Sequence, residues 1–219
     1  MSATDPRPGF LAIWSDVDAP AETDYLHWMT REHALERLGI PGFIAMRMFR
    51  ALDVEMRRYF ILYELEHAGV VASDAYLARL NHPTAWTQRT MARVSNFIRG
   101  GGHIEAVVGT GHGGFLTAQT LKRAAMADPS GLAAVAANSD RIAAARVLAT
   151  DHGRTSIQTR EKDLRAGDSS FDGLLVIEGL DAPAVRAAFS DVVRHAPSLA
   201  IGGDGSPTVY ETIFSRPRR

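Results

Sequence analysis

One segment of the chain combines residue types that can carry out acid–base chemistry. At about 100° per residue, one face of a helix would hold Tyr25, Trp28, Met29, Glu32, Leu35 and Glu36, with His33 at its edge. Apolar surroundings disfavour a charged carboxylate, and an imidazole exchanges protons near neutral pH. We therefore predict His33 as a general base, with Glu32 or Asp16 as its orienting carboxylate. The alternative is that Glu32 and His33 are surface residues or tie the helix to a loop.

Four further residues are candidate members of such a site. Arg47 interrupts an apolar strand and could clamp a substrate oxygen, although pairing with Glu64 or Glu66 on the next strand explains it equally well. Tyr63 could donate to a substrate oxygen or form a structural hydrogen bond. Trp28 and Trp86 offer flat contact surfaces, and core packing is the ordinary role of Trp86. For Asp16, capping a turn is the alternative to orienting His33.

Composition excludes several classes of function. The 24 Lys and Arg residues against 25 Asp and Glu give a net charge of -1, so we expect no nucleic-acid partner. The chain has no cysteine and therefore no thiolate chemistry. His27 and His33 do not share one helical face, so we predict no metal and no cofactor. The first ten residues lack an apolar signal region and no stretch could span a bilayer, which predicts a cytoplasmic protein.

The elements that position these residues follow a recognisable order. The motif helix, expected over 21–38, lies between a strand that begins near residue 9 and two strands at 43–52 and 57–65. Helical sequence over 73–98, interrupted at His82-Pro83, and a strand at 103–110 complete a βαββαβ unit. The second half repeats the order, with strands at 115–121, 155–162, 174–178 and 208–214 and helices at 130–148 and 182–194.

We interpret this repetition as a tandem duplication. Gly9-Phe10-Leu11 recurs as Gly114-Phe115-Leu116, which predicts one ferredoxin-like unit in residues 1–110 and a second, degenerate one in 111–219. An α+β unit of this kind leaves one sheet face bare. Two tandem units packed sheet to sheet would form an intramolecular dimeric α+β barrel. The protein would then be a monomer or a homodimer, with the motif once per chain.

A glycine-rich segment offers a competing interpretation. Gly109, Gly111 and Gly114 satisfy the G-x-G-x-x-G spacing of dinucleotide-binding loops. In that fold the last glycine opens a helix, whereas strand-like sequence follows here. We therefore favour a joint between the two halves.

The motif resembles the EthD-like branch of the dimeric α+β barrel superfamily. The pattern W-x-x-x-E-H-x-x-x-R-L-x-x-P-G-F is present as Trp28, Glu32, His33, Arg37, Leu38, Pro41, Gly42 and Phe43. Ser73, Tyr76, Pro83-Thr84, Trp86-Thr87 and Arg99 also look like that branch, so the resemblance covers residues 9–99. It implies a small-molecule pocket between helix and sheet. Cofactor-independent monooxygenases, isomerases, cyclases and decarboxylases occur in the superfamily, with haem proteins as distant members.

Three functions are consistent with these observations. The first is a cofactor-independent isomerase, cyclase, lyase or oxygenase that shifts a proton in an aromatic or lactone-like substrate. The second is a non-catalytic protein that binds a small apolar ligand, with Glu32 and His33 purely structural. The third is a haem-dependent oxidoreductase, although no histidine in the sequence stands out as an axial ligand.

Overall fold

A computed structural model describes residues 6–53, 57–165, 167–196 and 207–218 of the chain. In these residues eight strands form a closed antiparallel barrel in the order β1-β3-β2-β8-β5-β7-β6-β4. The strands are β1 (Gly9–Val17), β2 (Phe43–Ala51), β3 (Arg57–Leu65), β4 (Val94–Gly109), β5 (Phe115–Leu121), β6 (Ile142–Thr150), β7 (Gly173–Gly179) and β8 (Tyr210–Pro217). The first five residues, which belong to the N-terminal sequence considered above, lie outside the described residues.

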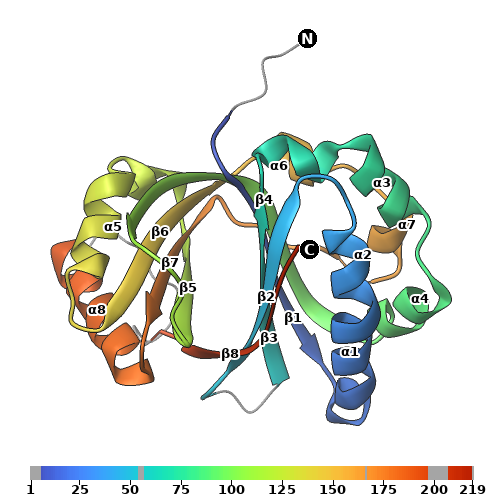
Figure 1. The fold of residues 1–219 in the computed structure, drawn as a ribbon, viewed down its shortest axis with the longest axis horizontal. Helices are drawn as coiled ribbons and strands as arrows, with labels where there is room; N and C mark the ends of the chain where they lie inside the picture. The colour runs from blue at the N-terminus through green and yellow to red at the C-terminus, as the bar shows by residue number, and fades with distance from the viewer. Residues whose placement is uncertain (1–5, 54–56, 166, 197–206, 219) are drawn as a thin grey trace.

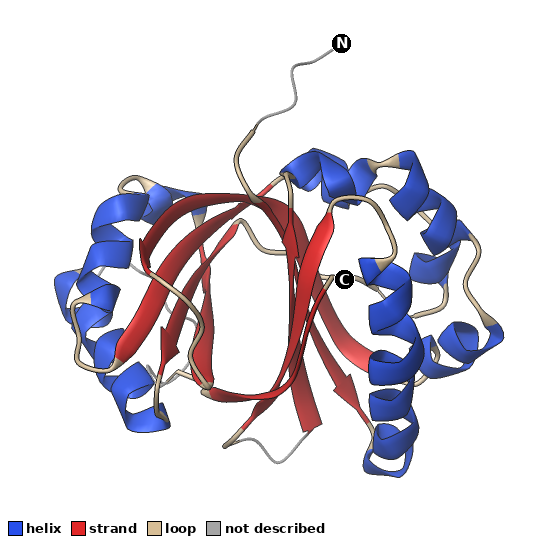
Figure 2. Ribbon diagram, viewed as in Figure 1, coloured by secondary structure: helices blue, strands red, loops and turns tan. Residues whose placement is uncertain are grey.

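The helices form two groups on opposite sides of the barrel (Figure 1, Figure 2). The first group comprises α1 (Glu22–Trp28), the π-helix η2 (Met29–His33), α2 (Ala34–Leu38), α3 (Asp74–Asn81) and α4 (Ala85–Met91). The second comprises α5 (Pro129–Ala137) and α8 (Ala182–His195). Two short helices, α6 (His152–Thr155) and α7 (Arg160–Asp163), belong to the second half but lie beside the first group (Figure 1). Single 3-10 turns are η1 (Ala19–Ala21), η3 (Ala68–Ala72) and η4 (Arg123–Met126).

Strand alternation divides the buried side chains into three cores. Along β1, Phe10, Ala12 and Trp14 point into the barrel, where they pack with residues of both halves. Leu11 and Val17 point the other way, toward the first group of helices. A third core lies between the second half of the sheet and helices α5 and α8. The barrel therefore lies between the two helical layers, each of which packs on its own part of the outer face of the sheet.

Apart from the short helices α6 and α7, which lie between β6 and β7, both halves show the element order strand, helical segment, two strands, helical segment, strand. The strands of the first half lie in the order β4-β1-β3-β2 and those of the second in the order β8-β5-β7-β6. Pairing of β2 with β8 and of β4 with β6 joins the halves and closes the barrel. The predicted α+β class with a barrel-like sheet is therefore confirmed.

Three predicted elements were wrong. The helix expected to run to residue 98 ends at Met91, because Val94 onward pairs with β1. The alanine-rich helix expected over 130–148 ends at Ala137, and 142–150 instead form β6, which pairs with β4 on one side and β7 on the other. The strand expected at 155–162 is replaced by α6, α7 and their connection. Tertiary pairing here overrides the helix propensity of alanine.

The glycine-rich segment is a turn between two strands. Gly109 and Gly111 have φ angles of 88° and 80°, which favour glycine, and β5 follows directly. The helix that a dinucleotide-binding loop requires is therefore not formed at this point. None of the described helices is both long enough and apolar enough to cross a membrane.

Candidate active site

A single wide helical turn decides which motif residue faces the core. The π-helix Met29–His33 follows α1 directly and adds one residue to the turn, so that the next inward position after Trp28 and Met29 is His33. His33 is 5% exposed, whereas Glu32 is only half-buried and Leu35 is 44% exposed. Regular helical spacing predicted that Glu32 and Leu35 would face inward and that His33 would lie at the edge of that face. Such wide turns occur frequently at functional sites.

His33 is a buried imidazole with no hydrogen-bond partner among the described residues. Its ring centroid lies 4.3 Å from that of Trp28, and its Nδ1 atom is enclosed and unpaired. Burial lowers the pKa of His33 well below its usual value, and the nearby cations Arg37 and Arg165 lower it further. His33 is therefore neutral at pH 7, with a lone pair available to accept a proton.

Arg37 lies one turn after His33 on the same inner face. Its Nη2 atom donates to Glu161 Oε2 at 2.5 Å, and its guanidinium lies 5.7 Å from the centroid of the Tyr76 ring. Burial acts against the charge of Arg37, but the contact with Glu161 outweighs it and raises the pKa of the guanidinium. Its Nη1 atom has no partner. Arg37 therefore keeps its charge and one free donor inside the protein.

Tyr63 on β3 contributes a third unpaired group. Its hydroxyl is buried and makes no hydrogen bond with any described residue. Burial raises the pKa of Tyr63, so the hydroxyl stays protonated and can donate. Unpaired buried polar atoms are uncommon in folded proteins and call for an explanation.

These three residues line one internal cavity. Its volume is about 30 Å³, and Trp28, Met29, Tyr76 and Met91 also form its walls. A space of that size holds a water molecule. The imidazole, the guanidinium and the phenol therefore surround a site that is polar at its centre and apolar at its walls.

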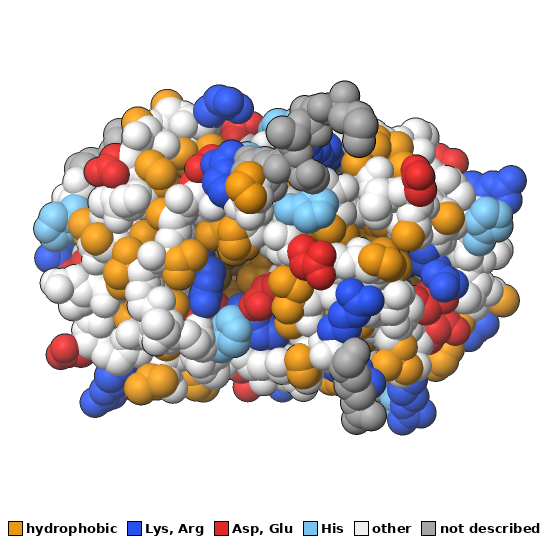
Figure 3. Space-filling view, turned by 45° about the horizontal axis from the view of Figure 1, so that its top comes forward, with side chains coloured by type: hydrophobic (Ala, Val, Ile, Leu, Met, Phe, Trp, Pro, Cys, Tyr) orange, Lys and Arg blue, Asp and Glu red, His pale blue; other side chains and the backbone are white. Residues whose placement is uncertain are grey.

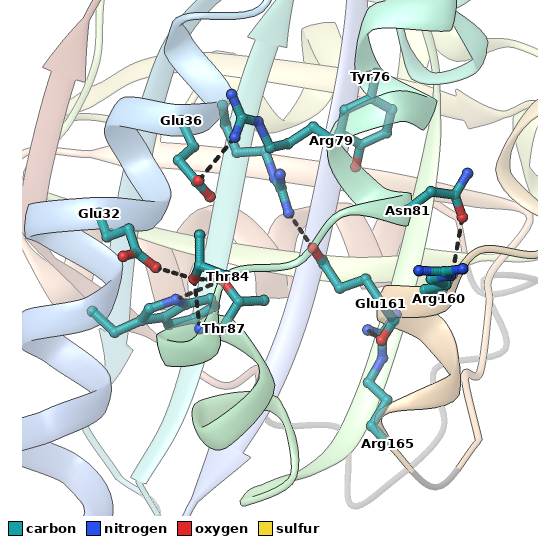
Figure 4. A network of polar contacts seen from close by, with 12 residues as sticks. Glu32, Glu36, Tyr76, Arg79, Asn81, Thr84, Thr87, Arg160, Glu161 and Arg165 are labelled. Atoms are coloured by element: carbon teal, nitrogen blue, oxygen red, sulfur yellow. Dashed lines mark hydrogen bonds and ion pairs between the residues drawn. The ribbon is translucent and has the colours of Figure 1, made fainter.

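The second half of the chain closes this cavity of the first half. Glu161 reaches the cavity from α7, and Figure 4 shows it among residues of the first helical group. The Arg160 backbone N–H also donates to the Asn81 side chain at 3.1 Å, which ties α7 to α3. Beside the cavity lies a polar cleft of about 580 Å³. Arg99, Lys162 and Arg165 line both spaces.

Glu32 lies next to this site but does not point into it. The Thr84 hydroxyl donates to Glu32 Oε1 at 2.6 Å (Figure 4). Trp28 Nε1 donates to the hydroxyl of Thr87 at 3.1 Å. Both bonds hold the start of α4 against the motif helix. Glu32 is thus bonded to a loop, and no bond between Glu32 and His33 is present.

Asp16 and Trp86 lie outside the cavity. Asp16 is buried and accepts a bond from the side chain of Asn96 at 2.8 Å, with no bond to His33 and no helix cap. The indole of Trp86 donates to Asp24 at 3.1 Å near the surface. The structure does not bring these two residues together with His33.

Arg47 points into the barrel, on the opposite face of the sheet. Its guanidinium donates twice to Glu178 of β7, at 2.6 and 3.0 Å, and lies 3.7 Å from Glu64. Burial opposes ionisation of Glu178, but hydrogen bonds from His112 and Arg47 outweigh it and lower its pKa to about 2. Figure 3 shows a hollow in the surface of the molecule, with apolar side chains at its floor and charged ones at its rim. Arg47 therefore links the two halves. Met46, Met48 and Tyr63 face the first group of helices, whereas the side chain of Arg47 lies on the other face of the sheet.

Sequence reasoning missed part of the site. Arg37 was within the motif, four residues after His33, but was not assigned a role there. Tyr76 and Arg99 were noted only for their resemblance to related proteins. Glu161 and Lys162 lie at the end of the segment 155–162 that was expected to be a strand, and Arg165 follows it. No local pattern places these residues beside the first half. Among the described residues, no cluster of three His, Asp or Glu side chains could hold a metal ion.

Comparison with known proteins supports the fold. No protein-family model matches the sequence, and neither does any curated protein. An anthrone oxidase-like protein of known structure superposes with a TM-score of 0.61 at 10% identity, covering 100% of this chain and 96% of the other. A proposed monooxygenase from Fusobacterium nucleatum gives 0.54 at 10% identity, covering 100% and 94%. A proposed chlorite dismutase gives 0.56 at 11% identity, covering 95% of both chains. This chain therefore shares its overall α+β barrel fold with these structures.

Proposed function

We propose that the protein is a small-molecule enzyme that uses cofactor-independent acid–base chemistry, with His33 as the general base. One observation carries the proposal: His33 Nδ1, Arg37 Nη1 and the Tyr63 hydroxyl are all buried, unpaired and part of one cavity. Leaving such groups unpaired costs stability, which favours a role in binding or catalysis.

The first chemical step follows from these three groups. Neutral His33 takes a proton from a carbon that a carbonyl activates, either directly or through a conjugated ring, and the electron pair moves onto the carbonyl oxygen. Arg37 Nη1 and the Tyr63 hydroxyl donate to this developing oxyanion, whose charge is stabilised most strongly where water is excluded. Glu32, bonded to Thr84, positions α4 instead of orienting His33. Trp28 holds the imidazole ring through a tilted ring-to-ring contact.

Among the reactions that begin this way, oxidation by molecular oxygen has the most support. Structural relatives include an anthrone oxidase-like protein and proposed monooxygenases. Anthrone carries an acidic CH₂ group activated by its ketone. After deprotonation the enolate gives electrons to O₂, and anthrone plus O₂ yields anthraquinone plus water. Isomerisation, cyclisation and lysis share the deprotonation step.

Entry of an aromatic substrate requires the cavity to widen beyond its volume of about 30 Å³. Met29 and Met91 form part of its wall, and methionine side chains adapt to ligands because they are unbranched and flexible. The adjoining cleft of about 580 Å³ supplies the way in. We therefore assign the cleft as the entrance and the cavity as the reacting end.

Deuterium exchange tests the proposed first step. Anthrone is incubated with the protein in D₂O without oxygen, and incorporation at the CH₂ group is followed by NMR. We expect His33→Gln to slow the enzymatic exchange about 100-fold or more. The control is His195→Gln, which removes an exposed imidazole of the second half and should leave the rate unchanged.

The same experiment separates the other functions. Equal exchange rates in the two variants, or binding of anthrone without any exchange, would overturn the assignment of His33 and favour the binding-protein alternative. Anthraquinone formation after air is admitted tests the oxidation itself. A Soret band in the spectrum of the purified protein would favour the haem-dependent alternative.

We also propose that the two halves, 1–110 and 111–219, arose by tandem duplication. Their shared strand order supports this interpretation. Membership of residues 9–99 in the EthD-like branch stays a prediction based on the motif.

A further inference from the structure

Two cationic side chains at the junction of cavity and cleft have no carboxylate partner among the described residues. Arg99 is 7% exposed, and its guanidinium donates to the Thr155 carbonyl oxygen at 2.9 Å and to the Tyr76 hydroxyl at 3.2 Å. Lys162 Nζ donates to the same Thr155 oxygen at 2.8 Å. Two positive groups therefore share one neutral acceptor, an arrangement in which each repels the other.

Neighbouring acidic groups are already engaged by other residues. Glu161 is bonded to Arg37, and Asp168 accepts two bonds from Arg165 at 2.6 and 2.7 Å. Asp163 accepts a bond from Gln158. Arg37 and Arg165 are thus neutralised in place, whereas Arg99 and Lys162 are not. Buried and half-buried charges without a counter-ion are costly, so this pair indicates a site for an anion.

The surroundings indicate what carries the negative charge. On the inner side the junction adjoins apolar residues of the cavity wall, including Leu80, Val94 and Phe97. On the outer side it opens into a polar cleft lined by Ser156 and Ser169. A ligand with an apolar body and one acidic group matches this division. Arg99 offers further N–H donors in a planar arrangement that suits the two oxygens of a carboxylate.

We propose that Arg99 and Lys162 form a receptor for the carboxylate of a small aromatic acid. Naming this acid as the substrate class rests on the proposed function, because the same junction leads to His33. Anion binding itself does not depend on catalysis. The receptor joins one residue from β4 of the first half with one from α7 of the second. The site is therefore complete only when both halves are in place.

Calorimetric titration with benzoate and with benzamide, its neutral isostere, tests this receptor at low salt. We expect benzoate to bind the intact protein about tenfold more tightly than benzamide, since a charge-assisted hydrogen bond is stronger than a neutral one. Lys162→Gln should reduce benzoate affinity about tenfold and leave benzamide affinity unchanged. Arg160→Gln is the matched control, because it removes an exposed charge from the same short helix.

Arg99→Gln should weaken benzoate binding by the same factor or more. Because Arg99 is buried, the thermal unfolding of the Arg99→Gln variant is compared with that of the parent protein. If Arg99→Gln fails to fold, the result for Lys162→Gln decides the test. Equal affinities for benzoate and benzamide would overturn the proposed carboxylate site. So would an equal effect of Lys162→Gln and Arg160→Gln on benzoate affinity. His33→Gln should keep its preference for benzoate. If His33→Gln loses deuterium exchange but the parent protein does not prefer benzoate, the carboxylate site alone is contradicted. If the parent protein prefers benzoate but His33→Gln keeps deuterium exchange, only the proposed catalysis is contradicted.

Discussion

The two helical layers pack on equivalent sheets but bury different chemistry. In the first layer the inward residues include Trp28, His33, Arg37 and Tyr63. Of their polar atoms, His33 Nδ1, Arg37 Nη1 and the Tyr63 hydroxyl have no hydrogen-bond partner among the described residues. In the second layer the core between the sheet and helices α5 and α8 consists of aliphatic side chains, alanines and Phe189. The first layer encloses a cavity with polar groups, whereas the second is filled by apolar contacts.

This difference teaches where the stability and the chemistry of the chain reside. An apolar layer without unpaired polar atoms gains from every buried group. A layer that keeps unpaired polar atoms on His33, Arg37 and Tyr63 loses stability there, and unsatisfied sites of this kind are typical of function. We therefore expect substitutions in the second layer to change stability alone and those in the first to change binding and chemistry.

The largest expected effect lies in the second layer. Phe189 is 1% exposed, and Phe189→Ala should reduce the free energy of unfolding by about 3–5 kcal/mol because it leaves a cavity. Urea unfolding measures this loss. Under conditions where the variant is fully folded, its benzoate affinity should match that of the parent protein. A parallel fall in affinity would show that the two layers are coupled.

A pH-dependent effect distinguishes the first layer. Since burial, Arg37 and Arg165 lower the pKa of His33, the unfolded chain takes up a proton below its ordinary pKa of about 6.5 while the folded chain does not. Protonation thus favours unfolding, and stability falls as the pH is lowered. We expect the free energy of unfolding to fall by up to about 1.4 kcal/mol per pH unit between pH 6 and 5 because of His33.

His33→Gln should remove that contribution, whereas His195→Gln should retain it. Urea unfolding at several pH values measures the difference between the two variants. Glu178 does not affect this difference, because its contribution, which is lost as the pH falls from 4.5 toward about 2, is the same in both variants. The same pH dependence in both variants would contradict a buried, neutral His33.

The smallest expected effect on stability concerns an unpaired hydroxyl. Tyr63→Phe removes a buried group that has no partner, so the free energy of unfolding should change by less than about 1 kcal/mol and can rise. Tyr25→Phe is the matched control, because the Tyr25 hydroxyl is bonded to that of Ser15 at 2.9 Å and its loss should cost about 1 kcal/mol. A clear destabilisation by Tyr63→Phe would indicate a structural partner for its hydroxyl.

Much of the fold follows from local sequence patterns. Alternation and turn residues predicted β1, β2, β3, β5, β7 and β8 close to their observed positions, and α8 likewise. The errors fall where local preference and tertiary pairing conflict. The several alanines among residues 142–148 favoured a helix, yet residues 142–150 form β6, which pairs with β4 and β7. Backbone pairing on both sides outweighs the small free-energy preference of alanine for helix.

The sequence alone identified the motif that supplies Trp28 and His33, because aromatic and ionisable residue types at that spacing are visible without a structure. Only the tertiary structure decided which motif residue enters the cavity. The wide turn at Met29–His33 advances the helix by one residue, which turns His33 and Arg37 inward and leaves Glu32 to Thr84. Tertiary structure also placed Glu161 against Arg37, 124 positions earlier in the sequence, and Lys162 beside Arg99, 63 positions earlier. Contacts at that separation depend on closure of the barrel, which no local pattern encodes.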